Sequence, residues 1–242
     1  IIDLPLQIDS SDAGAIEAAL RIYNGKAIIN SVNGKAEIMD TIFKIARKYG
    51  ACVVGLTLDE NGIPSSAEER FKIAEKIVNT AEKYGIPKEN LLIDCLVLTA
   101  SAQQKEVSET LKAITMVREK LGVKTVLGVS NVSFGLPDRA LLNRTFLTMA
   151  LHSGLTTPIL NPQSEEMMHI IKAFNVLTNQ DKDSAEYIDF FNNSDTKKEI
   201  IKNTDLELPD IIRLGLKEEG KSKIYSLLKE YQPMYIIDNY LI

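Results

Sequence analysis

The sequence predicts an α/β protein in which parallel strands alternate with helices. Six short runs of β-branched and apolar residues are each followed by a stretch of helical periodicity. The runs are almost continuously apolar, which is typical of strands that are covered on both faces, as in parallel sheets. The predicted strands are Pro5–Asp9, Ala27–Val32, Cys52–Leu58, Leu91–Leu98, Thr125–Val132 and Thr156–Leu160.

The intervening segments place apolar residues three or four positions apart, so that one face of each predicted helix packs inward. This spacing occurs at Ile38, Ile42 and Ile45, at Val107, Leu111 and Ile114, and at Ile170, Phe174 and Leu177. A glycine after a helix commonly takes the left-handed conformation that closes the last turn. The glycines expected to do so are Gly25, Gly50, Gly85, Gly122 and Gly154.

Regular alternation of this kind fits either an open doubly wound sheet or a closed (β/α) barrel, and periodicity alone does not separate them. No G-x-G-x-x-G motif follows the first strand, which disfavours a dinucleotide-binding sheet. An eight-stranded barrel needs two more units than the sequence shows. If the fold is a barrel, the chain is expected to begin at its third strand.

The pattern changes near Asn179, where a polar stretch rich in Asn, Asp, Ser and Lys begins. We interpret it as a linker with at most short helices. Helical periodicity returns afterwards, with Gly215 and Gly220 expected as breaks and Pro233 before the last helix. The predicted domains are a barrel over residues 1–178, a linker over 179–207 and the start of a helical domain over 208–242, with helices at Leu208–Leu216, Ile224–Tyr231 and Ile236–Ile242.

Composition narrows the functional class. The 242 residues are 45% apolar and carry a mild net charge of −5, so we expect a soluble globular protein without a nucleic-acid or anionic-membrane surface. Cys52 and Cys95 each lie within an apolar run, which favours two small buried thiols in a reducing compartment, the cytoplasm. No apolar stretch reaches the roughly 18 residues of a membrane span.

Candidate site residues stand where the predicted strands stop, because barrel enzymes carry their reactive groups at the carboxyl ends of strands. Carboxylates and carboxamides that meet at one rim suit a planar heterocycle rich in hydrogen-bond donors and acceptors, and a pterin fits that description. The residues in question are Asp9, Asn30, Asp94, Asn131 and Asn161.

Structural alternatives exist for several of these residues. Asp9 could cap the following helix, although Ser10, Ser11 and Asp12 are better placed to do so, and Asn30 could close a turn with Ser31. Asp94 stands on a run that continues to Leu98, so a purely structural role would bury an unpaired carboxylate. The run Gly128–Gly135 is rich in small polar residues and could be a bulged strand and loop.

Other kinds of chemistry have weak support in the sequence. Arg139 taken alone could pair with a surface acid. His152 and His169 have no neighbours at zinc-ligand spacing, so no metal site is expected. The chain also lacks a serine-hydrolase elbow and a phosphate-binding loop, which argues against acyl and phosphoryl transfer.

Several segments together resemble the methyltetrahydrofolate:corrinoid methyltransferase family, which includes the folate-binding domains of cobalamin-dependent methionine synthases and the corrinoid/iron–sulfur protein methyltransferases. The resemblance runs from Pro5 to about Leu177 in order and with compatible spacing. The segments that carry it are Gln7–Ser10, Ala15–Ala18, Ile29–Ser31, Gly55–Thr57, Gly62–Pro64, Leu92–Asp94, Thr125–Ser133 and Leu142–Phe146.

The resemblance implies a (β/α)8 TIM-type barrel, with strands three to eight in this chain, followed by the start of an all-α cobalamin cap domain. Two residues depart from the family pattern, Phe134 at a position that is polar in some relatives and Cys95 where proline often follows the aspartate. Carried over position by position, the pterin-binding residues are Asp9, Asn30, Asp94, Gly128, Ser130 and Asn131, the catalytic residue beside the methyl-bearing N5 atom is Asn131, and the corrinoid-facing residue is Arg139.

The implied activity is binding of 5-methyltetrahydrofolate and transfer of its N5 methyl group to a cobalt(I) corrinoid. The cobalamin would be carried by a partner domain or a corrinoid protein, in a methionine-synthase-like protein. The alternatives are a non-catalytic folate-binding docking module and a dihydropteroate-synthase-like enzyme, whose basic signatures are absent here. A third alternative is an unrelated barrel enzyme. Such an enzyme would normally need a lysine or a metal cluster at the carboxyl ends of the strands, whereas Lys26 and Lys124 stand at strand beginnings. Exposed edges of an incomplete barrel would also allow a homodimer.

Overall fold

The computed structural model describes residues 4–192, 207–213 and 217–240. The chain divides into two compact units, Ile1–Pro162 and Gln163–Ile242, which are considered separately below. Gly215 and the part of the predicted linker from 193 to 206 lie outside the described residues.

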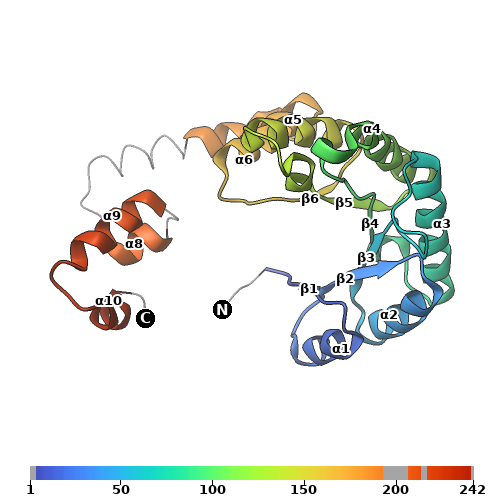
Figure 1. The fold of residues 1–242 in the computed structure, drawn as a ribbon, viewed down its shortest axis with the longest axis horizontal. Helices are drawn as coiled ribbons and strands as arrows, with labels where there is room; N and C mark the ends of the chain where they lie inside the picture. Colours follow the sequence, from blue (N-terminus) through green and yellow to red (C-terminus); the bar gives the residue numbers. More distant parts are fainter. Residues whose placement is uncertain (1–3, 193–206, 214–216, 241–242) are drawn as a thin grey trace. The chain divides into compact units, whose positions relative to one another are not determined.

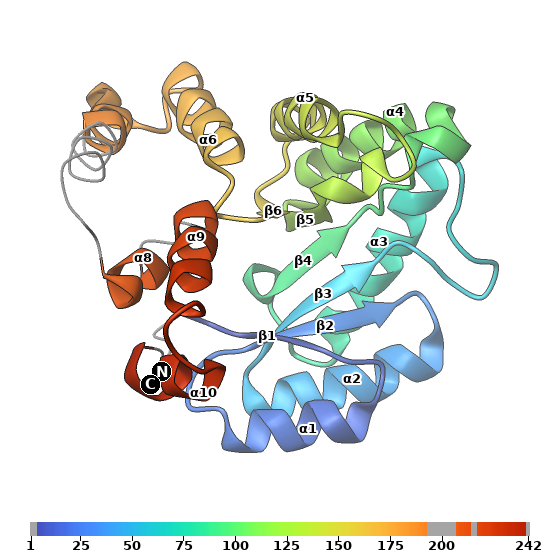
Figure 2. The same ribbon diagram turned by 60° about the vertical axis from the view of Figure 1, so that its left-hand side comes forward.

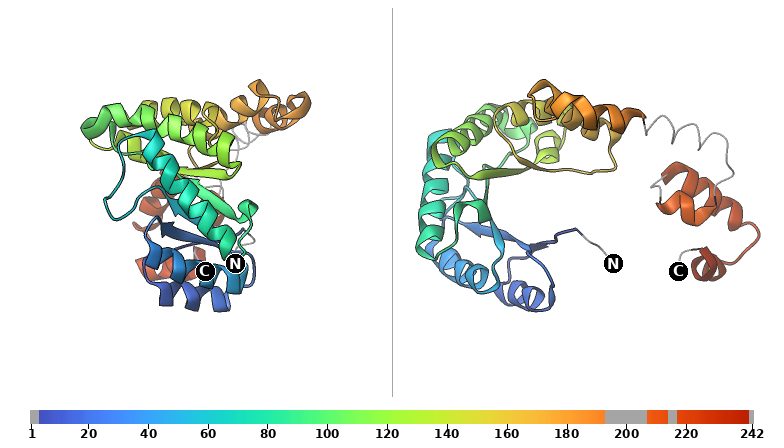
Figure 3. Two further views of the ribbon diagram at one scale, coloured as in Figure 1. Left: turned by 90° about the vertical axis from the view of Figure 1, so that its right-hand side faces the viewer. Right: turned by 180° about the vertical axis from the view of Figure 1, so that it is seen from behind.

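The first unit contains a six-stranded parallel sheet whose strands are neighbours in chain order. The sheet curls, and helices α1 to α5 cover its convex face (Figures 1 and 3). The arrows of the central strands run in one direction in Figure 2. The predicted α/β class with parallel strands is confirmed. The strands are β1 (Gln7–Asp9), β2 (Ile28–Asn33), β3 (Cys52–Leu56), β4 (Leu91–Asp94), β5 (Lys124–Gly128) and β6 (Thr157–Ile159), and the helices are α1 (Ala13–Ile22), α2 (Ala36–Tyr49), α3 (Ala67–Lys83), α4 (Ala100–Met116) and α5 (Arg139–His152).

Side chains alternate between the two faces of the sheet, as in any strand. On the four central strands those that point toward the helices are buried, and Gly55 on this face lies against Ile77 of α3. The concave face carries a smaller apolar cluster of Val54, Leu92 and Val126. The helix-facing residues with 0% exposure are Ile29, Val53, Ile93 and Leu127. The main core therefore lies between sheet and helices.

Helix ends follow the expected chemistry at most positions. The Asp12 carboxylate accepts from the N–H of Gly14 at 2.8 Å and so caps α1. Gly50, Gly85, Gly122 and Gly154 all have positive φ near helix ends, as predicted. Gly25 does not, so the prediction was wrong there: α1 ends at Ile22 and is followed by extended backbone at Tyr23.

Every strand except β2 is shorter than predicted, and the largest differences are at the ends of β4 and β5. β4 ends at Asp94 instead of Leu98, because Leu96 has a φ of +57° that no strand accommodates. β5 ends at Gly128, and residues Val129–Ser133 form a 3-10 helix. Two residues predicted on inward helix faces are exposed, Ile38 at 37% and Leu177 at 84%.

In the second unit, α6 (Glu165–Leu177) contacts a helical segment over residues 185–192. Lys172 and Glu186 form an ion pair of 2.7 Å between the two segments. The helices α8 (Leu208–Arg213), α9 (Lys217–Leu227) and α10 (Pro233–Tyr240) follow. Gly220 lies inside α9, so the break predicted at this glycine was wrong. Across the described residues, no helix combines the length and apolar character that a membrane crossing requires.

The contact between β3 and α3 depends on the absence of a side chain at Gly55. A Cβ atom there would lie 2.9 Å from Cγ2 of Ile77 and 3.1 Å from Cδ1 of Ile93, both fully buried. We expect Gly55→Ala to lower the free energy of unfolding by about 1–3 kcal/mol, because the core would be overpacked. Urea unfolding measures this change. Gly14→Ala in the first turn of α1 is the control and should not destabilise the chain. A Gly55→Ala protein as stable as the wild type would contradict the prediction.

Candidate functional site

The predicted site residues on strands share the concave face and the carboxyl end of the sheet. Asp9 of β1 pairs with Asn30 of β2, so their side chains leave the sheet on the same side. Asp94 follows Leu92 at a spacing of two along β4, which places it on the face of the concave cluster. Asp94 is aligned with Val126 of β5, and Gly128 is two residues further on. Asp9, Asn30, Asp94 and Gly128 therefore lie along one edge of the sheet, the rim at the carboxyl ends of its strands.

Asp9 and Asn30 line a pocket of about 440 Å³ at the beginning of α1 and α2. Asp12 caps α1, so the capping alternative for Asp9 is not needed. Asn30 lies within β2 and not at its end, and its peptide bond with Ser31 is cis. Other lining residues are Ser10, Ser11, Ala13, Ser31, Asn33, Ile38, Thr41 and Ile42. Ile38, expected in the core, instead contributes an apolar wall here.

Asp94 is the last residue of β4 and is held through both its carboxylate and its backbone. Its Oδ1 accepts from the N–H of Leu96 at 2.7 Å, and its carbonyl oxygen accepts from the N–H and the hydroxyl of Thr57 at 3.0 and 3.1 Å. Burial raises the pKa of Asp94 to about 6, although the Leu96 N–H and the positive charge of Arg70 act in the opposite direction. The carboxylate form thus predominates at neutral pH but is protonated by mild acid.

Asn131 lies on the 3-10 helix that directly follows β5. A Cβ atom on Gly128 would lie 3.1 Å from Nδ2 of Asn131, so glycine at this position makes room for the asparagine side chain to fold back over the strand end. Asn131 and Ser130 are exposed. The turn therefore presents an amide at the rim, where a bound molecule can reach it.

Arg139 begins α5 and braces the same turn. Its Nε donates to the Ser133 hydroxyl at 3.0 Å, and its Nη2 donates to the carbonyl oxygen of Ser130 at 3.1 Å. The guanidinium also lies 4.4 Å from the centroid of the Phe134 ring, within cation–π range. In this structure Arg139 thus supports the segment that holds Asn131, and its contact with a corrinoid stays a prediction.

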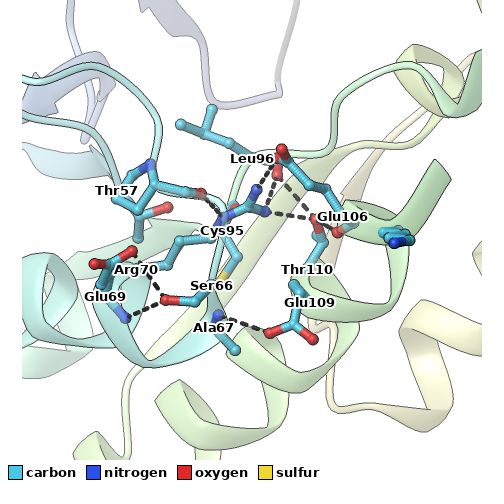
Figure 4. Close-up of polar contacts among 12 residues, drawn as sticks. Thr57, Ser66, Ala67, Glu69, Arg70, Cys95, Leu96, Glu106, Glu109 and Thr110 are labelled. Atoms are coloured by element: carbon cyan, nitrogen blue, oxygen red, sulfur yellow. Dashed lines mark hydrogen bonds and ion pairs between the residues drawn. The ribbon is translucent and has the colours of Figure 1, made fainter. Parts of the chain in front are cut away.

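Sequence reasoning missed Arg70 of α3, which is 0% exposed and contacts the loop after Asp94 (Figure 4). The available signal was its position, because Arg70 precedes the buried residues Ile73, Ala74 and Ile77 at helical spacing and so falls on the buried stripe of α3. A basic residue on such a stripe indicates a buried polar network.

The remaining candidates do not form a second site. His152 is exposed, and the described residues contain no group of three or more metal-binding side chains. Cys95 is buried, and burial raises the pKa of its thiol. Cys52 is partly buried, and neither cysteine is in a disulfide. Asn161 is exposed, beyond the end of β6.

Residues 1–161 match the model of a protein family described as pterin binding enzyme. The chain belongs to this family. The resemblance to methyltetrahydrofolate:corrinoid methyltransferases is confirmed by this match together with the curated relatives.

Three curated proteins show the likeness. Methionine synthases of Mycobacterium leprae and Mycobacterium tuberculosis are 34% and 33% identical over 171 residues, which is 65% of this chain. The methylcorrinoid:tetrahydrofolate methyltransferase of Eubacterium limosum is 28% identical over 189 residues, which cover 77% of this chain and 70% of that protein. The aligned part spans 14% of the length of each methionine synthase.

Among solved structures, the dihydropteroate synthase of Clostridium difficile superposes with a TM-score of 0.55. The superposition covers 73% of this chain and 68% of that chain at 17% sequence identity. At this identity the likeness concerns the fold. It supports the curled parallel sheet with outer helices as the fold of the first unit.

The raised pKa of Asp94 predicts how stability depends on pH. The folded state favours the protonated form, so its stabilising contribution is present below the unfolded pKa near 3.8 and is lost as the pH rises through about 6. Asp94→Asn should therefore be more stable than the wild type at pH 8, by on the order of 2 kcal/mol, with the difference vanishing toward pH 4. Urea unfolding at both pH values measures the effect. Equal stability of the two proteins at pH 8 would be evidence against a buried carboxylate.

Proposed function

We propose that this chain binds 5-methyltetrahydrofolate on the rim that carries Asp9, Asn30 and Asp94, and transfers the N5 methyl group to a cobalt(I) corrinoid. The protein would be a methyltransferase of the methionine-synthase or methylcorrinoid:tetrahydrofolate kind, as the names of its relatives suggest. The observation that carries the proposal is the convergence of two carboxylates and two carboxamides at one end of a pterin-binding sheet.

The chemistry of these side chains suits a pterin. An ionised carboxylate only accepts hydrogen bonds, and the edge of a reduced pterin presents several N–H donors. Asp94 has one oxygen held by Leu96, and no further partner of its carboxylate is found among the described residues, so the other oxygen is free to accept from a ligand. Asp9 and Asn30 contribute a carboxylate and an amide beside the pocket of about 440 Å³. Together these groups would orient the ring before reaction.

Asn131 is the proposed catalytic residue. The methyl group leaves from a tertiary amine, which is a poor leaving group unless its nitrogen gains a proton. An amide has no proton to give up as a titrating acid does, but its hydrogen bond strengthens as charge develops on N5. We therefore assign to Asn131 the stabilisation of the protonated N5, with the proton arriving from water. Its exposed position on the turn after β5 supports this role.

The corrinoid would supply the nucleophilic cobalt when it is carried to the rim by a cobalamin-binding domain or a separate corrinoid protein. The residues around Asn131 fit such an approach, because Phe134 is 49% exposed and offers an apolar ring beside the amide. Arg139 stacks on this ring and fixes its place. An exposed aromatic ring next to the methyl-bearing atom suits contact with a large macrocycle.

We also propose that the six strands are strands three to eight of an eight-stranded barrel. In the described residues, β1 and β6 each pair on one side, and the sheet between them is already curled. The helices α8, α9 and α10 would begin the cap domain of a cobalamin-binding region, with residues 1–178, 179–207 and 208–242 as barrel, linker and cap. Isolated pairing edges could also bring two copies of the chain together as a homodimer.

Calorimetry of the intact protein with 5-methyltetrahydrofolate tests the assignment of Asp94 and Asn131. We expect Asp94→Ala to weaken binding by at least about a hundredfold, since a charged acceptor is lost from a partly dry site. Asn131→Ala should bind within a few-fold of wild type but transfer methyl to cobalt(I) cobalamin about a hundredfold more slowly.

The matched controls are Asp40→Ala on the outer surface of α2 and Asn61→Ala on the turn after β3, neither of which should change binding. Absence of folate binding by the well-folded wild-type protein would refute the proposal. Folate binding without transfer to any cobalt(I) corrinoid would favour the docking-module alternative.

A further inference from the structure

A buried arginine lies behind the Asp94 side of the rim. The side chain of Arg70 is 0% exposed and makes five hydrogen bonds, to the loop before α3, the loop after β4 and helix α4. Nε donates to the carbonyl oxygen of Pro64 at 2.7 Å, and Nη2 contacts Glu106 of α4 at 2.9 Å. Nη1 contacts the carbonyl oxygens of Cys95 and Leu96 at 3.1 and 2.8 Å and the Thr110 hydroxyl at 2.7 Å. Figure 4 shows the guanidinium among these partners.

Burying a guanidinium is unfavourable unless its charge and its N–H groups are matched. Burial lowers the pKa of Arg70, whereas the Glu106 carboxylate opposes that shift. The carbonyl oxygens of Cys95 and Leu96 accept from the guanidinium, whose N–H groups point in fixed directions within one plane. The ammonium group of a lysine does not supply this geometry. An arginine that holds only the helices together would not need to bind this loop.

The loop that Arg70 holds is the one that orients Asp94. Leu96 has a φ of +57°, a left-handed conformation that is unfavourable for a residue with a branched side chain. Its carbonyl oxygen accepts from both Arg70 and the Thr110 hydroxyl, while its N–H donates to Oδ1 of Asp94. A single residue thus connects the buried guanidinium to the carboxylate of the site.

We propose that Arg70 is a positioning residue for folate binding: it holds Leu96 in the left-handed conformation and thereby directs the Asp94 carboxylate toward the pterin without touching the substrate. This inference rests on the proposed function and deepens it. Arg70 also has an electrostatic effect, because its positive charge favours the ionised form of Asp94.

The charged and titratable groups around this pair are few. Asp94 faces Arg70 of α3 and lies next to the Cys95 thiol, while Arg70 faces Glu106 and Glu109 of α4. Removal of the Arg70 charge should raise the pKa of Asp94 above its value of about 6, so the pterin-binding carboxylate would be lost at a higher pH. Loss of the planar guanidinium without loss of the charge should disturb the position of the Asp94 carboxylate at every pH.

Two variants of the intact protein separate these effects. Arg70→Lys keeps the charge and loses the planar guanidinium, so we expect affinity for 5-methyltetrahydrofolate to fall about tenfold at both pH 6 and pH 8. Arg70→Met loses both, and its affinity should fall further at pH 6 than at pH 8. Calorimetry gives the affinities. Carbon-13 NMR of the Asp94 carboxyl group, without folate, gives its titration midpoint, which should rise in Arg70→Met and stay near wild type in Arg70→Lys.

Arg118→Met is the matched control for loss of a structural arginine. Arg118 donates to the carbonyl oxygen of Val123, which precedes β5 at the opposite end of the sheet from Asp94. This variant should lose stability without a change in folate affinity. If the Arg70 variants do not fold, Thr110→Val removes a partner of both Arg70 and the Leu96 carbonyl while leaving the charge, and should still weaken binding several-fold.

Folded Arg70→Lys and Arg70→Met proteins that bind folate as the wild type does, with an unchanged Asp94 titration, would overturn the inference. If the Arg70 variants do not fold, wild-type affinity in Thr110→Val would overturn it. A wild-type protein that does not bind folate would refute the proposed function, and the NMR titration of Arg70→Met would then still decide whether Arg70 controls Asp94.

Discussion

The pairing of six parallel strands in chain order, with helices α1 to α5 on one side, is the constraint on which the rest of the first unit depends. Parallel pairing in one sheet brings every carboxyl strand end to the same rim. Burial of Ile29, Val53, Ile93 and Leu127 against the helices then fixes which alternate positions face the concave side. A shift of one residue in any strand would exchange a core residue for a site residue, so packing of the core also sets the orientation of the site.

The loops on this rim form hydrogen bonds with the loops next to them. The N–H of Gly34 after β2 donates to the carbonyl oxygen of Leu58 after β3 at 2.8 Å. Thr57 in turn binds the carbonyl oxygen of Asp94, and the Ser101 hydroxyl donates to the carbonyl oxygen of Phe134 after β5 at 3.0 Å. Each loop thus uses a backbone polar group of the next one, which keeps partly buried backbone satisfied where the regular ladder has ended.

Much of the fold was predictable because it depends on local patterns. All six strands follow from apolar runs, and the cap of α1 was predicted among the short polar side chains Ser10, Ser11 and Asp12, of which Asp12 is the cap. The ends of β4 and β5 were not predictable, because Leu96 takes a left-handed conformation beside Asp94 and a 3-10 helix begins at Val129, and the runs of apolar residues conceal both changes. The placement of Asp94 on the rim followed from the strand pattern, whereas the support from Arg70 arises from carbonyl groups that only the folded chain brings together.

The neighbour-to-neighbour bonding of the loops has a consequence for how the site can change during evolution. A substitution in the loop after β5, around Phe134, directly perturbs the β4 loop through Thr99 and Ser101, but within the described residues no hydrogen bond joins this loop to the pocket at Asp9 and Asn30. Mutational coupling should therefore decay along the rim from one loop to the next. Such a gradient lets one end of the rim diversify while the other end keeps its chemistry.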